Sequence, residues 1–354
     1  MSVGTLRRLV LGVAVVALAG ATAVARASAG TGWMIQRTPN PDSGSGPLNN
    51  QLHGVSCTSA SACTAVGIRG GSPLSERWNG TDWTVQPTPN PSKRVFPSEL
   101  LGVSCVSATA CTAVGDSPRG SLIESWNGTR WSIQWTSTSL TGANLNGVSC
   151  TSTTACTAVG SADGGALAER WNGTKWTVQS VPMPSGQSGL LYGVSCTSAT
   201  ACVAVGYSDT SGPSTTVPLV ERWDGTSWSI QSTPKSSQTE SYMLAVSCTS
   251  PTACIAVGTL AERWNGTNWT ILTGGGGNAV SCTSPTACTA VGGLDASVWN
   301  GTGWSVETMP NPTSANSAEM LGVSCTLPTA CTAVGYWATA SPNDNLFTLA
   351  EQHS

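Results

Sequence analysis

The fourteen cysteines of this sequence are its most regularly spaced reactive side chains. They form seven Cys-x5-Cys pairs with none left over: Cys57/Cys63, Cys105/Cys111, Cys150/Cys156, Cys196/Cys202, Cys248/Cys254, Cys282/Cys288 and Cys325/Cys331. Zinc sites usually place their cysteines about two to four residues apart and add a second pair or histidines. This chain has only two histidines. The spacing therefore predicts seven disulfides, each of which closes a very short loop, and we group these cysteines with the candidate site residues.

Ionisable side chains also recur at fixed positions. The glutamates at one repeated position are Glu76, Glu124, Glu169, Glu221, Glu262 and Glu351, and the next position holds Arg77, Arg170, Arg222 and Arg263. A catalytic pair is needed once and not six times, so we expect these residues to form ion pairs between repeats or to cap turns. Tryptophan pairs such as Trp78 and Trp83 flank a turn, and we expect them to be buried against neighbouring repeats.

All of these residues belong to one motif that is written seven times. Its fullest form is Leu-x-Gly-Val-Ser-Cys-Thr-Ser-x-x-Ala-Cys-Thr-Ala-Val-Gly, a variable stretch, and Leu-x-Glu-Arg-Trp-Asn-Gly-Thr-x-Trp-x-x-Gln. Successive first cysteines lie 34 to 52 residues apart, which is the period of a four-stranded propeller blade. In the first repeat we predict strands at residues 52–57, 63–67, 74–78 and 83–86, a polar turn at 58–62, and a hairpin turn at Asn79-Gly80.

The two ends of the repeat array complement each other. The last repeat stops at Gln352, before its fourth strand, and the segment 31–36 matches the fourth-strand segment 302–307. Pairing these ends would close a ring and remove exposed sheet edges. We therefore predict an all-β fold, a seven-bladed β-propeller closed by an N-terminal strand that completes the last blade. An open β-solenoid is the alternative, and it gives no reason for the displaced strand.

Residues 1–29 have the pattern of an export signal. Arg7 and Arg8 precede an apolar stretch at 9–24, and Ala27-Ser28-Ala29 is a small-residue cleavage site. We expect cleavage after about Ala29, a secreted bacterial protein without a membrane span in its mature form, and a single propeller domain over 30–354. An uncleaved membrane anchor is the alternative. The sequence leaves the general secretory and twin-arginine routes both open.

Charge is scarce in this chain. Only 9% of the residues are charged and the formal net charge is −3, whereas about 25% of the residues of a typical protein are charged. With so little charge and a negative net charge, the composition gives no electrostatic reason to expect nucleic-acid binding. The sequence contains no nucleophile elbow, phosphate-binding loop or calcium loop. We predict a monomer without a cofactor or a metal.

A ligand site is expected where the repeat varies. The disulfide turns and the Asn-Gly turns share one face, so the variable loops form the other face. The residue before Gly-Val-Ser-Cys, or its Ala-Val-Ser-Cys variant, is expected to begin each inner strand at the channel mouth. The candidate ligand-binding residues are His53, Asn146, Tyr192 and Asn278 at that position, Asp116, Tyr207 and Tyr336 after Ala-Val-Gly, and Trp337. Ordinary solvated loop chemistry is the alternative, and no catalytic residue is assigned.

The Asn-Gly-Thr-x-Trp hairpin resembles the Asp-box of sialidase-type (BNR-like) propellers. It occurs at 79–83, 127–131, 172–176, 265–269 and 300–304, and Asp224 replaces the Asn in the fourth repeat. The leading Ser or Thr of the box is Glu or Ser here. The chain is also similar to secreted bacterial repeat proteins rich in Gly-Val-Ser-Cys and Trp-Asn-Gly-Thr. The resemblance implies a propeller with these boxes on the face away from catalysis, and it transfers no activity.

Three classes of function follow. The preferred one is a non-catalytic exported binding or adhesion module that takes a glycan or a protein through its variable loop face. The second is a sialidase-like glycoside hydrolase. By resemblance, it would need a tyrosine nucleophile, Tyr207 or Tyr336, and three arginines, yet none of the few non-repeat arginines lies on a predicted inner strand. The third is a structural envelope protein without a discrete ligand.

Overall fold

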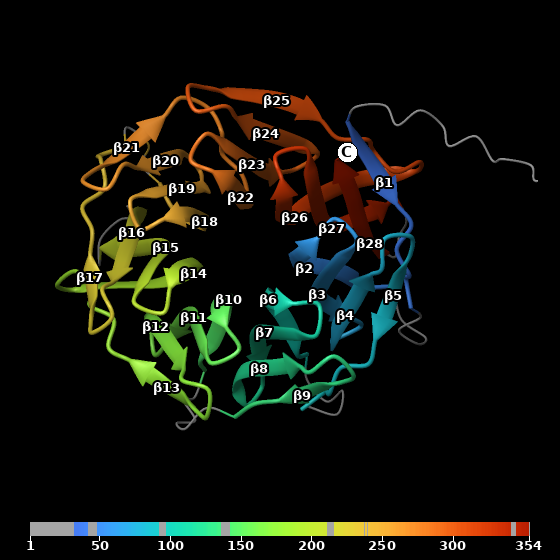
Figure 1. Ribbon diagram of the computed structural model, residues 1–354, viewed down its shortest axis with the longest axis horizontal. Coiled ribbons are helices and arrows are strands. Elements are labelled where there is room, and N and C mark those ends of the chain that lie inside the picture. Colours follow the sequence, from blue (N-terminus) through green and yellow to red (C-terminus); the bar gives the residue numbers. More distant parts are fainter. Residues whose placement is uncertain are drawn as a thin grey trace, which may run out of the picture. The chain divides into compact units, whose positions relative to one another are not determined.

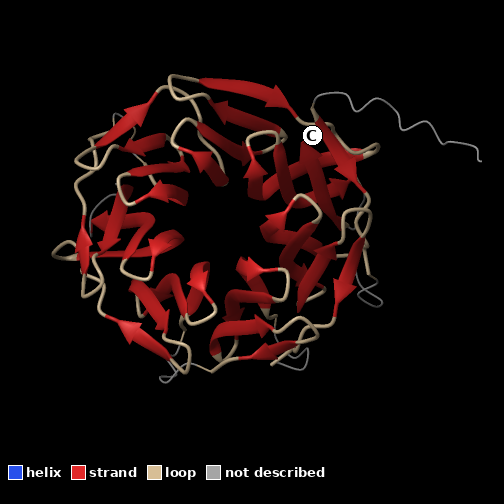
Figure 2. Ribbon diagram, in the orientation of Figure 1, coloured by secondary structure: helices blue, strands red, loops and turns tan. Residues whose placement is uncertain are grey.

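The computed structural model describes residues 32–41, 48–91, 97–135, 142–210, 216–236, 238, 240–340 and 345–353. The predicted export signal and its cleavage site lie outside these residues. The described residues form 28 strands and no helix. Figure 2 shows the strands in red. No segment of the described chain is a helix long and apolar enough to cross a membrane.

The strands form seven four-stranded antiparallel sheets arranged in a ring (Figure 1). From the inner to the outer strand, blade 1 is β2 (Asn50–Ser59), β3 (Ala62–Arg69), β4 (Ser72–Trp78) and β5 (Trp83–Gln86), and blade 2 is β6 (Glu99–Ser107), β7 (Ala110–Ser117), β8 (Gly120–Trp126) and β9 (Trp131–Ile133). Blade 3 is β10 (Asn144–Ser152), β11 (Ala155–Ala162), β12 (Gly165–Trp171) and β13 (Trp176–Gln179), and blade 4 is β14 (Gln187–Ser198), β15 (Ala201–Thr210), β16 (Thr216–Trp223) and β17 (Trp228–Ile230). Blade 5 is β18 (Met243–Ser250), β19 (Ala253–Gly258), β20 (Ala261–Trp264) and β21 (Trp269–Leu272), and blade 6 is β22 (Ala279–Ser284), β23 (Ala287–Gly292), β24 (Asp295–Trp299) and β25 (Trp304–Thr308).

Blade 7 combines the two ends of the chain. Its inner strands are β26 (Ala315–Leu327), β27 (Ala330–Thr339) and β28 (Leu346–His353), and its outer strand is β1 (Trp33–Gln36). Residue Trp33 pairs with His353, and Gln36 Nε2 donates a hydrogen bond to Gln352 Oε1 at 2.6 Å. The predicted seven-bladed propeller, sealed by a displaced N-terminal strand, is confirmed.

The seven predicted disulfides are also confirmed, and each joins the inner two strands of one blade. Cys57 faces Cys63 directly across β2 and β3, with 4.0 Å between the two Cα atoms. This short separation is typical of a facing pair that exchanges no backbone hydrogen bonds. The strands continue past the disulfide until Ser59 pairs with Ala62. The predicted turn at 58–62 was therefore too long, and only residues 60–61 connect the strands.

The second cysteine of each disulfide is buried in the core. These cysteines lie on the second strand of each blade, which packs between neighbouring sheets. Their exposed fractions are 2–4%, and they are Cys63, Cys111, Cys156, Cys202, Cys254, Cys288 and Cys331. The bonds Cys196–Cys202, Cys248–Cys254, Cys282–Cys288 and Cys325–Cys331, like the other three, therefore have a structural role.

A closed ring of hydrogen bonds explains why Ser precedes Cys in the repeat. The first cysteine of each blade donates its backbone N–H to the serine hydroxyl of the preceding blade. For example, Cys105 N–H donates to Ser56 Oγ at 3.0 Å, and Cys57 N–H donates to Ser324 Oγ at 3.0 Å. The same bond links all seven neighbouring pairs. The inner strands are thus joined around the entire ring, including the junction where the chain ends meet.

Glycine in Ala-Val-Gly is required by a close backbone approach. A Cβ atom added to Gly115 would overlap the carbonyl oxygen of Glu99 and crowd the Cα atom of Leu100. The equivalent Gly67, Gly160, Gly206, Gly258 and Gly335 meet the same obstacle in their own blades. The inner strand therefore crosses the second strand at a point where no side chain fits.

We predict that Gly115→Ala destabilises the protein by about 3 kcal/mol, because the new methyl group must displace two packed strands of backbone. Chemical denaturation followed by tryptophan fluorescence measures the change. Gly165→Ala is the matched control, because its added Cβ meets nothing closer than 3.8 Å. Equal stability of the two variants would contradict the steric role of Gly115.

The acid–base contacts within 4.0 Å seen among the described residues involve His53 and His353, and none of them includes Glu76, Glu124, Glu221, Glu262 or Glu351. Neighbouring residues of a strand point to opposite faces, so each glutamate and the arginine after it are separated. Glu124 is fully buried, and neither of its carboxyl oxygens has a hydrogen-bond partner. Arg77 instead lies over the ring of Trp126 in the next blade, 5.0 Å from the ring centre. The expected burial of the tryptophan pairs is seen in part: Trp83, Trp126 and Trp131 are each 5% exposed, whereas Trp78 is half-buried.

Candidate functional site

The predicted position before Gly-Val-Ser-Cys lies within the inner strand and not at its start. In blade 1 the strand begins at Asn50, and a β-bulge between Leu52 and Gly54 leaves His53 without a partner on β3. The same bulge occurs in five other inner strands, and Asn278 directly precedes the inner strand of blade 6. A bulge redirects one side chain out of the regular alternation. We call these seven residues the bulge ring: His53, Leu101, Asn146, Tyr192, Leu244, Asn278 and Leu321.

Three polar members of the bulge ring bond to the next blade. The Nδ1 atom of His53 lies 3.2 Å from the carbonyl oxygen of Leu100. Asn146 Nδ2 donates to the carbonyl of Leu191 at 2.8 Å, and Asn278 Nδ2 donates to that of Met320 at 2.9 Å. Each accepting carbonyl belongs to the residue just before the next bulge residue. These three side chains therefore join adjacent blades, in addition to any role in ligand binding.

The first cluster of the site joins blades 1 and 2. The Nδ1 atom of His53 lies 3.6 Å from Glu99 Oε2, and Glu99 pairs in register with Asp116. Burial lowers the pKa of His53, which favours the neutral imidazole at neutral pH. Burial, and then the nearby Asp116 charge, raise the pKa of Glu99, and burial raises the pKa of Asp116. This cluster is a half-buried acidic pair next to a neutral histidine.

The second cluster is aromatic and belongs to blades 4 and 5. The rings of Tyr192 and Tyr207 lie 6.0 Å apart, centre to centre, and are tilted by 39°. Burial is the main cause that raises the pKa of the Tyr192 phenol, and Tyr207, Tyr242 and Asp209 raise it further. The cluster offers the phenol groups of three tyrosines and one carboxyl group.

The third cluster joins blades 6 and 7. Asn278 Nδ2 donates to Glu319 Oε1 at 2.9 Å, and the Tyr336 hydroxyl donates to Glu319 Oε2 at 3.0 Å. Burial and the Glu319 carboxylate raise the pKa of Tyr336, so its phenol stays protonated at neutral pH. Trp337 does not join this cluster, because it stacks on Phe347 of its own blade at 4.5 Å.

Three residues of these clusters were missed at the sequence level. Glu99, Tyr242 and Glu319 all lie two residues before a member of the bulge ring. A comparison of the repeats at that position would have singled them out, because they are the acidic and aromatic residues there. Only the structure shows that they contact the predicted residues.

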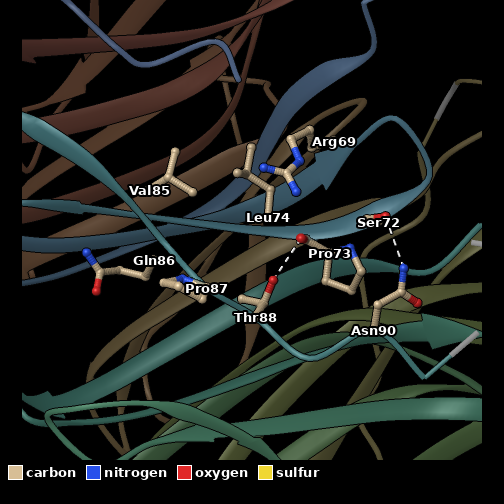
Figure 3. Close-up of a pocket in the computed structure, with 9 residues that line it drawn as sticks. All are labelled: Arg69, Ser72, Pro73, Leu74, Val85, Gln86, Pro87, Thr88 and Asn90. Carbon is tan, nitrogen blue, oxygen red and sulfur yellow. Dashed lines mark hydrogen bonds between the residues drawn. The ribbon is translucent and has the colours of Figure 1, made fainter. Parts of the chain in front are cut away.

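The structure also contains a cavity of about 500 Å³ on blade 1, drawn in Figure 3. Arg69, Pro73 and Thr88 are among the residues that line it, and Thr88 Oγ1 donates to the carbonyl of Pro73 at 2.8 Å. None of the eight predicted ligand-binding residues lines this cavity. Within the described ranges, no three His, Cys, Asp or Glu side chains are grouped as metal ligands would be.

Comparisons with known proteins identify the fold alone. No protein-family model matches this chain, and no curated protein matches its sequence. Among solved structures, YCF48 bound to a D1 peptide is similar with a TM-score of 0.60 and 13% identity, over 91% of this chain and 96% of that one. YCF48 from Cyanidioschyzon merolae has a TM-score of 0.58 and 15% identity, over 91% and 98% of the two chains. The Swd1 propeller domain of Myceliophthora thermophila has a TM-score of 0.54 and 6% identity, over 87% and 99%. This chain therefore shares the β-propeller fold with proteins to which its sequence bears little likeness.

Proposed function

We propose that this chain is an exported, non-catalytic binding module that holds a polypeptide segment on the face formed by its variable loops. The observation that carries the proposal is the grouping of polar and aromatic side chains into the three clusters described above. Their members lie on or directly before the inner and second strands of different blades and include His53, Tyr192 and Asn278 of the bulge ring. An extended segment that crosses this face would meet several of them at once, as peptides do on other binding surfaces.

The charges of the clusters favour a basic segment. Glu99, Asp116, Asp209 and Glu319 are carboxyl groups, and the described members of the three clusters include no lysine or arginine. Complementary charge increases both the rate of association and its specificity. The tyrosines add rigid aromatic surface, which is enriched at energetically important interface positions. At the level of the fold, a solved relative bound to a peptide shows that a propeller of this kind can take such a ligand.

Selection from a random-peptide display library tests the proposal, with a glycan array run in parallel. We expect peptides rich in lysine and arginine, with binding that weakens as salt rises. Tyr192→Ala should weaken the selected peptide about tenfold, the loss typical of an interface aromatic residue. Trp135→Ala is the control, because Trp135 is 62% exposed and contributes to none of the three clusters. Selection of acidic peptides, or binding of glycans alone, would overturn the proposal.

A further inference from the structure

The repeated arginines fill a defined space between neighbouring blades. Arg77 and Arg170 lie over Trp126 and Trp223 of the following blades, with 5.0 and 4.3 Å from guanidinium carbon to ring centre. Each of these arginines also donates a hydrogen bond to a backbone carbonyl of that blade's disulfide turn, at Ala108 and Ala199 respectively. The chain therefore shows repeatedly how a guanidinium group is held at this junction.

Blade 2 lacks this arginine. Ser125 occupies the position, and its hydroxyl lies 3.3 Å from the hydroxyl of Ser132 on the neighbouring strand. A cavity of about 240 Å³ opens between blades 2 and 3. At the two junctions where Arg222 and Arg263 are present, the corresponding cavities are about 10 Å³. Blades 6 and 7 also lack the arginine and have Val298 and Gln352 at its position. The missing side chain of blade 2 leaves a space that the arginine fills at the junctions of Arg222 and Arg263.

The tryptophans that face an arginine of the preceding blade are also more buried than the tryptophan that faces Ser125. Trp126, Trp223, Trp264 and Trp299 follow blades that carry the arginine, and all four are buried. Trp171 follows Ser125 and is only half-buried. Its indole N–H donates to the carbonyl of Thr153 at 3.1 Å, the carbonyl that corresponds to the arginine acceptors at Ala108 and Ala199. In the junctions that hold an arginine, the indole N–H groups of Trp126 and Trp223 have no hydrogen-bond partner, whereas those of Trp264 and Trp299 donate to the equivalent carbonyls of Pro251 and Pro285, each at 3.3 Å.

The walls of the cavity suit a guanidinium group. Trp171 offers an aromatic face, and a planar cation stacks on such a face. Gln134 and Thr112 add polar atoms, and the Cys150–Cys156 disulfide forms part of the wall. The Thr153 carbonyl has a second lone pair for a new donor. A lysine ammonium has the charge but not the planar, forked geometry.

We propose that the cavity between blades 2 and 3 binds the arginine side chain of a partner polypeptide. The partner's guanidinium takes the place of the repeated arginine, stacks on Trp171 and donates to the Thr153 carbonyl. This site lies on the face of the disulfide turns and Asn-Gly turns, opposite the loop-face clusters. It is independent of the proposed function.

Titration with the tripeptide acetyl-Gly-Arg-Gly-amide tests the proposal. The readout is the indole N–H resonance of Trp171, assigned with the Trp171→Phe variant. The resonance should shift on binding, because the arginine competes for the Thr153 carbonyl. The matching citrulline peptide has nearly the same shape without the charge, and should bind at least about tenfold more weakly. The lysine peptide should fall between the two.

Two variants of Ser125 distinguish a cavity that is filled by a side chain from a protein that no longer folds. Ser125→Arg restores the repeat residue, so it should fill the cavity and abolish the peptide-induced shift. Ser125→Ala leaves the cavity open and should preserve the shift. Equal responses to the arginine and citrulline peptides, or an unchanged response in Ser125→Arg, would overturn the proposal. Dimerisation that Ser125→Arg abolishes, without any peptide response, would assign the cavity to a second copy of the chain instead.

Discussion

Deletion of residues 33–36 is expected to lower the melting temperature by roughly 10 °C or more. These residues form β1, which pairs with β28 and supplies the fourth strand of blade 7. Their loss exposes the backbone edge of β28 and removes Trp33, which is 8% exposed. It also removes the Gln36 oxygen that accepts a hydrogen bond from Trp83 Nε1 of blade 1 at 2.7 Å. The strand therefore stabilises two blades at the point where the ring closes.

Differential scanning calorimetry of the deletion variant measures this effect. Met34→Thr is the control, because Met34 is 45% exposed and the substitution preserves the strand. A synthetic peptide with the sequence of residues 32–41 should restore part of the lost stability when it is added in excess. A deletion variant with the same melting temperature as the wild type would contradict the role of β1 in closing the ring.

Stability is expected to fall as the pH rises from 5 to 9, because five buried glutamates have raised pKa values. Burial raises the pKa well above 4.5 at Glu76, and to about 8 at Glu124, Glu221 and Glu351 and about 7 at Glu262. Below about pH 4.5 the side chains are protonated in both states and make no difference. Between pH 4.5 and 8 the unfolded chain ionises while the folded chain keeps its protons, so this contribution to stability decreases with pH. Because one such glutamate accounts for several kcal/mol over this range, the melting temperature should drop by at least roughly 20 °C between pH 5 and pH 9.

Glu124→Gln isolates one of these groups. The amide is neutral at every pH, so the variant should match the wild type near pH 5. Above that it should become more stable than the wild type by about 1.4 kcal/mol per pH unit, up to about pH 8. Denaturant titrations at several pH values measure the difference.

Glu240→Gln serves as the control, because Glu240 is exposed. A difference between Glu124→Gln and the wild type that does not change with pH would contradict a buried, protonated Glu124. Ser297 occupies the equivalent position in blade 6, so the fold already accepts a neutral residue there.

Most of the fold could be predicted because it is repeated. Each of seven copies gives the same strand pattern, and the displaced segment 31–36 matches a complete fourth strand elsewhere. The burial of the glutamates could also have been predicted. Alternation along a strand places Glu76 and Arg77 on opposite faces, so Arg77 can reach the next blade, where it lies over Trp126.

The site was harder to predict, because its contacts cross between blades. Asn278 meets Glu319, 41 residues further along the chain, only because the ring brings blades 6 and 7 together. The bulge at His53 has no distinctive residue, since the same position also holds Leu101 and Leu244. Its position depends on the crossing of two strands at Gly67. Sequence comparison among the repeats locates such positions, but it does not say which of them come together.

Hydrogen exchange with and without a selected basic peptide tests the central claim most directly, since it reports where a polypeptide is held. Binding on the loop face predicts slowed exchange at residues 97–102, 187–192 and 315–321, which form the inner-strand segments of the three clusters, and unchanged exchange at the turns 58–62 and 79–83. Slowed exchange confined to those turns, with the inner-strand segments unchanged, would contradict it.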